Sequence, residues 1–159
     1  MKLFFGLTFF LFAILMTGGC VVTKLTASRA IDRRLDRAEI SADAQIMAVQ
    51  LTVVLRAMEE WGITSGHTIP YWPTDKNNVA LDYEAIQNLR NRAVEVAKDD
   101  RTSAAYATNL ADMRQTVQRI NVDAGTYVQF HTGWLYVALL CYLVCVVLGG
   151  WKVVYWLKE

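Results

Sequence analysis

The residues best suited to chemistry are two histidines and three cysteines, and they form no set that a reaction or a metal requires. His67 lies beside prolines and aromatics in a polar stretch, and His131 stands near an uncharged run. Cys141 and Cys145 are one helical turn apart within that run. Metal and haem sites need further ligands and supporting partners, which this spacing does not supply. We therefore predict no catalytic residue, no metal and no cofactor.

The carboxylates give no sign of acid–base catalysis either. Glu59-Glu60 and Asp99-Asp100 are adjacent pairs, and neighbours in a helix point in different directions. Phosphate-binding loops, nucleophile elbows and paired zinc histidines are absent from the sequence. The sequence favours a protein that is not an enzyme.

The composition indicates a membrane protein. Hydrophobic residues make up 54% of the 159 residues and charged residues 19%, whereas soluble domains carry roughly 25% charge. Most of the excess lies in two uncharged runs, 3–23 and 124–150. With 16 Lys+Arg against 15 Asp+Glu, the net charge is +1, so a basic face for nucleic acid is not expected.

The N-terminal run, residues 1–23, has two interpretations. A helix of about 20 residues reaches about 30 Å, which is enough to cross a bilayer. Alternatively, Lys2 begins a signal-like segment that ends in Thr17-Gly18-Gly19-Cys20. That ending resembles the lipobox of bacterial lipoprotein signal peptides, which implies cleavage before Cys20 and its lipidation. We therefore expect either an uncleaved membrane anchor or a lipoprotein-type signal.

Residues 132–157 predict a C-terminal transmembrane helix, because an uncharged run is bounded at both ends by aromatic residues. Such residues favour the two membrane interfaces, and a lysine near a helix end reaches outward to water. The predicted membrane-interface residues are Trp134, Tyr136, Trp151, Lys152, Tyr155 and Trp156.

Small residues recur along one side of each run at helical spacing, which lets a second helix approach closely in lipid. We predict helix packing there, either between the two runs or with a partner protein. The predicted helix-packing residues are Gly6, Ala13 and Thr17 in the first run, and Ala138, Cys141, Cys145 and Gly149 in the second.

Residues 24–123 predict an extramembrane bundle of about three helices, with one loop over 63–81. The first helix is expected to be unbroken over 25–61, because its apolar residues recur every three or four positions. Asp82 is the expected cap of the second helix. The third is expected to continue into the membrane, with Gly125 as a hinge. The predicted seam is Ile31, Leu35, Ala38, Ala42, Ile46, Val49, Val53 and Ala57.

Two places are predicted to form interaction surfaces. The stretch 44–58 is nearly all apolar, so Val49 and Val53 are expected to pack against another part of the chain or a neighbour. Tyr71 and Trp72 lie between prolines in the loop, and displayed aromatics are typical of protein or membrane contacts.

These observations predict an all-α membrane protein that acts as an accessory or scaffold subunit of a bacterial membrane complex. Its expected partners are membrane lipids and other membrane proteins or a second copy. Lysines and arginines follow both runs, so the topology evidence conflicts. The signal-like start favours the inner membrane with the bundle extracytoplasmic. Two alternatives are a holin-like pore-former and a sensor-like hairpin, which resembles the input half of bacterial chemoreceptors.

Overall fold

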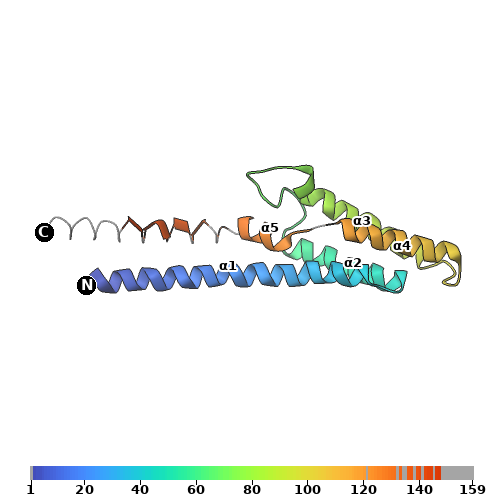
Figure 1. Cartoon of the computed structure of the whole chain (residues 1–159), viewed down its shortest axis with the longest axis horizontal. Helices are drawn as coiled ribbons and strands as arrows, with labels where there is room; N and C mark the ends of the chain where they lie inside the picture. Colours follow the sequence, from blue (N-terminus) through green and yellow to red (C-terminus); the bar gives the residue numbers. More distant parts are fainter. Residues whose placement is uncertain are drawn as a thin grey trace.

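The computed structural model in Figure 1 describes residues 2–120, 122–131, 133, 136–137, 139–140, 142–144 and 146–147, without the side chains of residues 2–10, 13 and 16. This part of the chain is helical, with one isolated antiparallel bridge between His67 and Asn78 and no strand. The all-α class is confirmed for it. No helix within these residues is both long and apolar enough to cross a membrane.

The helices are α1 (Lys2–Glu39), α2 (Ala44–Glu60), the 3-10 turn η1 (Asp75–Asn77), α3 (Val79–Val96), α4 (Ala104–Arg119) and α5 (Ala124–His131). Helices α1 to α4 pack in a ring, in which α1 contacts α2, α2 contacts α3, α3 contacts α4 and α4 contacts α1. Helix α5 packs on the middle of α1, where Gly125 meets Lys24 (Figure 1). Within the described residues, the ring of α1 to α4 therefore has one helix more than the three predicted, and α5 is a further helix beside it.

The additional helix arises because the predicted unbroken helix over 25–61 is wrong. Helix α1 ends at Glu39, and Asp43 caps α2 by accepting a 2.7 Å hydrogen bond from the backbone N–H of Gln45. From α4, Arg114 Nε donates to the Ser41 carbonyl oxygen at 2.9 Å and the Tyr106 hydroxyl accepts from Ala44 N–H at 2.9 Å. The turn is thus held by a side-chain cap and by distant side chains, and it needs neither glycine nor proline.

This turn changes the face that α2 buries. On α1, Ile31, Leu35 and Ala38 are buried, as the seam predicted. On α2, however, the buried face is shifted, and Val49 and Val53 are 56% and 37% exposed. Ala42, Ile46, Val49 and Val53 therefore do not continue the buried seam within the chain, whereas the packing of Val49 and Val53 against a neighbour stays a prediction. The core residues of α2 are Ala44, Met47, Ala48, Leu51, Val54, Leu55, Ala57 and Met58.

Each of the next two helices buries residues that recur every three or four positions. They are Ile86, Leu89, Ala93 and Val96 on α3, and Tyr106, Leu110, Met113 and Val117 on α4. Their starts are set by side-chain caps. Ser103 Oγ accepts from Tyr106 N–H at 3.1 Å, whereas Asn78, not Asp82, caps α3 by accepting from Ala80 N–H at 3.1 Å. The loop therefore ends at residue 78, earlier than predicted.

The third predicted helix is also interrupted. Helix α4 ends at Arg119, Ile120 is extended, and Asp123 accepts from Thr126 N–H at 2.9 Å at the start of α5. Gly125 is not a hinge but a contact point on α1. A Cβ atom there would lie 3.2 Å from the backbone oxygen of Lys24 and 2.9 Å from its Cγ. The missing side chain lets α5 approach α1 closely.

Replacing Gly125 with valine should push α5 away from α1. Because a backbone oxygen cannot move aside as a side chain can, we expect the free energy of unfolding to fall by about 1–3 kcal/mol. Denaturant unfolding of the full chain in detergent micelles, followed by circular dichroism, measures this. Gly18→Val is the matched control, since nothing lies within 4 Å of a Cβ at Gly18. Equal losses in both variants would contradict the close-contact role.

Asp82 makes the stability of the fold depend on pH. Burial raises the pKa of Asp82 from 3.8 to about 6, so the folded state holds its proton where the unfolded state has lost it. Stability due to this group is therefore lost as the pH rises through about 6. Asp82→Asn should raise the free energy of unfolding by on the order of 1 kcal/mol at neutral pH and flatten the pH dependence. The free energy of unfolding of the wild-type chain and of Asp82→Asn, measured across this pH range, tests the prediction. The same pH dependence in both chains would contradict it.

Candidate functional site

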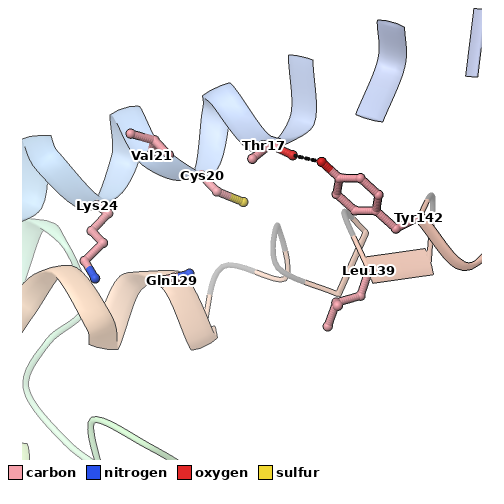
Figure 2. A pocket seen from close by; sticks show the side chains of 7 residues that line it. All are labelled: Thr17, Cys20, Val21, Lys24, Gln129, Leu139 and Tyr142. Carbon is pink, nitrogen blue, oxygen red and sulfur yellow. Dashed lines mark hydrogen bonds between the residues drawn. The ribbon is translucent and has the colours of Figure 1, made fainter. Parts of the chain in front are cut away.

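The two apolar runs meet at one end of the bundle, beside α5. Described residues between 136 and 147 have helical backbone and run next to the N-terminal half of α1 (Figure 1). Thr17 Oγ1 and the Tyr142 hydroxyl lie 3.4 Å apart and form a hydrogen bond (Figure 2). A hollow of about 190 Å³ opens between the two segments. It is lined by Thr17, Cys20, Val21 and Lys24 of α1, by Gln129 of α5, and by Leu139 and Tyr142.

Of the predicted helix-packing residues, Thr17 lies at this junction and contacts the second run through Tyr142. The surroundings of Gly6 and Ala13 lie outside what the structure describes, as do Ala138, Cys141, Cys145 and Gly149. Cys20 is 7% exposed, with a free thiol directed toward the gap (Figure 2). Lipidation of Cys20 stays a prediction.

A second candidate surface is the aromatic loop, residues 69–74. Trp72 is 75% exposed and Tyr71 66% exposed, as large aromatic side chains seldom are. The Tyr71 hydroxyl lies 2.5 Å from the hydroxyl of Tyr136, a predicted membrane-interface residue. Of the other predicted interface residues, Trp134, Trp151, Lys152, Tyr155 and Trp156 lie outside the described residues. The aromatic loop therefore contacts the second run at Tyr136.

Hydrogen bonds hold the aromatic loop in one shape. At its base, Thr68 N–H donates to the Asn77 carbonyl oxygen at 2.8 Å and Val79 N–H to that of Gly66 at 2.9 Å. At its tip, Asn77 Nδ2 donates to the Trp72 carbonyl oxygen at 2.6 Å. Gly66 has φ of 85°, a conformation that favours glycine. Trp72 is thus displayed by an ordered segment.

Tyr127 of α5 ties this segment to the junction. Its hydroxyl donates toward the carbonyl oxygens of Ser65 and Gly62, at 3.0 and 3.2 Å. Burial raises its pKa, so the donor proton is retained at neutral pH. His131 stacks on the Tyr127 ring with centroids 3.9 Å apart. His131 thus packs on Tyr127, and His67 lies in the bridge to Asn78.

The third surface is the α2–α3 groove, a hollow of about 550 Å³ between these helices. Its apolar part includes Val49, Val53 and Val94, which are all exposed. Three cationic side chains and no carboxylate line it. The lining residues are Gln45, Ala48, Val49, Thr52, Val53, Arg56, Arg90, Val94, Ala97 and Lys98.

Arg90 is the most unusual member of the α2–α3 groove. Its Nε atom is buried and has no hydrogen-bond partner among the described residues. Lys98, in contrast, bonds to Glu95 at 2.8 Å. A buried donor without a partner costs free energy, so Arg90 is held here at a cost in stability.

Sequence reasoning identified Val49, Val53, Tyr71 and Trp72, but it missed the residues of α3 that complete the groove. Arg90 and Val94 lie outside the buried face of α3, and nothing in the sequence indicates that this side faces α2. The tether by Tyr127 was missed as well, because a loop-to-helix hydrogen bond over such a separation leaves no local pattern. Among the described residues, no three His, Cys, Asp or Glu side chains are grouped so as to hold a metal ion.

Comparison with known proteins gives no relative for this chain. No family model matches it, and neither a curated protein nor a solved structure does.

Removing the Tyr127 hydroxyl should loosen the segment that carries the aromatic loop. We expect Tyr127→Phe to cost about 1 kcal/mol and to speed amide hydrogen exchange over residues 62–78. Tyr106→Phe is the matched control, because its hydroxyl bonds to Ala44 N–H instead and its loss should speed exchange at the α1–α2 turn. Exchange over 62–78 that is unchanged in Tyr127→Phe would contradict the tether.

Proposed function

We propose that this chain is a non-enzymatic, membrane-anchored helical subunit that binds another protein of a bacterial membrane complex. The two apolar runs are its anchors, and the bundle presents the binding surface. This proposal keeps the anchor interpretation of residues 1–23, in which α1 retains the segment before Cys20.

The observation that carries the proposal is the α2–α3 groove. Along α2, Ile46, Val49 and Val53 form an exposed aliphatic stripe, being 52%, 56% and 37% exposed. A contiguous exposed apolar patch with a polar rim is typical of interaction sites. The cations Arg56 and Arg90 stand at its edge, so a partner with apolar and acidic side chains suits the surface.

The anchoring part of the proposal is supported by the junction. The hydrogen bond from Thr17 to Tyr142 joins the two runs side by side at one end of the bundle. Two runs that leave a bundle together can enter one bilayer as a hairpin. The α2–α3 groove, whose residues belong to the bundle helices, then stays accessible outside the membrane. We place that membrane as the bacterial inner membrane and the bundle on its extracytoplasmic side.

Val49→Asp tests the binding surface. Since Val49 is exposed, the substitution should change the free energy of unfolding by only about 0.5 kcal/mol, yet place a charge in the groove. In native electrophoresis of mildly solubilised host membranes, the wild-type chain should migrate in an assembly larger than itself. The Val49→Asp chain should be lost from that assembly.

Ala107→Asp is the matched control, because Ala107 is an exposed residue of α4 on another side of the bundle. It should keep the assembly intact. Migration of the wild-type chain alone would contradict the accessory function. An assembly that survives Val49→Asp would show that the groove is not the binding surface. Sensor-like and holin-like hairpins are the alternatives, and only the holin-like one predicts that expression depolarises the membrane.

A further inference from the structure

We propose that the aromatic loop is a third membrane contact, in which the Trp72 indole lies in the lipid headgroup region of the bilayer that holds the two apolar runs. The inference rests on the proposed membrane anchoring. It adds a lipid-contacting site to a part of the chain that is far from both runs in sequence.

Exposure is the first argument. Trp72 and Tyr71 are 75% and 66% exposed, whereas Trp61 at the end of α2 packs against the core. Leaving a large aromatic side chain in water forgoes the free energy that its burial supplies. Indole and phenol rings have an apolar body and a polar tip, a combination that favours the boundary between lipid and water.

Order is the second argument. The Asn77 side chain bonds to the Trp72 carbonyl oxygen at 2.6 Å and accepts from Thr74 N–H at 2.9 Å. Trp72 N–H also donates to the Ile69 carbonyl oxygen at 3.2 Å. Because the backbone is already fixed, inserting Trp72 requires little further ordering of the chain.

Position is the third argument, and it selects lipid over a protein partner. The Tyr71 hydroxyl meets that of Tyr136, one of the predicted membrane-interface residues. Tyr127 of α5 ties the preceding segment to the same end of the bundle. In Figure 1 this loop reaches back from α3 to the level of α5, toward the end where the runs leave the bundle. Trp72 therefore lies at the depth predicted for the membrane interface.

Fluorescence quenching in vesicles tests the inference. The full chain is reconstituted in phosphatidylcholine vesicles, with and without bromine on the acyl chains close to the headgroups. The emission of the wild-type chain minus that of Trp72→Phe reports Trp72 alone. We expect this component to be blue-shifted and to lose most of its intensity in brominated vesicles. The matched control is Trp61→Phe, whose difference spectrum should be insensitive to bromine.

Flotation of the same vesicles on a density gradient distinguishes a failure of the membrane anchoring from a failure of the Trp72 contact with lipid. A chain that floats and shows bromine quenching of Trp72 but not of Trp61 supports the inference. A chain that floats with an unquenched Trp72 overturns it and leaves the anchoring intact. Equal quenching of both tryptophans overturns it too, since the whole bundle would then lie in the lipid. A chain that does not float overturns the anchoring and the inference with it.

Discussion

The close packing of α5 on α1 is the constraint on which the rest of the structure depends. Helix α1 is one continuous element that supplies both the N-terminal apolar run and the buried seam from Ala27 to Ala38. Gly125 lets α5 rest against the backbone of Lys24, at the level where the run joins the bundle. Because α5 is the first part of the second run, this contact sets the two runs beside each other at one end of the bundle.

The same end of the molecule also gathers the aromatic loop. Tyr127 of α5 holds the segment before it, and Tyr136 meets Tyr71. The surfaces are thus separated: one end of the bundle carries apolar and aromatic groups suited to lipid, whereas the α2–α3 groove carries an aliphatic stripe with cations suited to a protein. This separation connects the fold to the proposed role as an anchored binding subunit.

The helical faces could be predicted wherever one helix uses one periodic pattern, as in α3, α4 and the second half of α1. The periodic apolar pattern did not predict the breaks between α1 and α2 and between α4 and α5. Apolar spacing runs on past Ala38 through Val53, but Asp43 caps a new helix there and Arg114 and Tyr106 hold the turn from α4. Such contacts join residues far apart in the sequence, so periodicity cannot reveal them. The composition of the aromatic loop predicts displayed aromatic side chains, and Tyr71 and Trp72 are exposed. The tether of this loop and its place beside the second run leave no pattern in the sequence.

Thiol cross-linking of the junction tests the central claim, that the two apolar runs lie side by side, most directly. In a chain whose native cysteines are replaced by alanine, Thr17→Cys and Tyr142→Cys are introduced together and membranes are treated with a short bifunctional thiol reagent. The Tyr142 hydroxyl at the far end of the ring meets Thr17, so the two Cβ atoms are about one tyrosine side chain apart, which is too far for a direct disulfide but within reach of such a reagent. We therefore expect this pair to be cross-linked and both thiols to become protected from alkylation. Val22→Cys with Tyr142→Cys is the control pair, since Val22 is 62% exposed and does not line the junction. Free thiols in the first pair, or equal protection in both, would contradict the account.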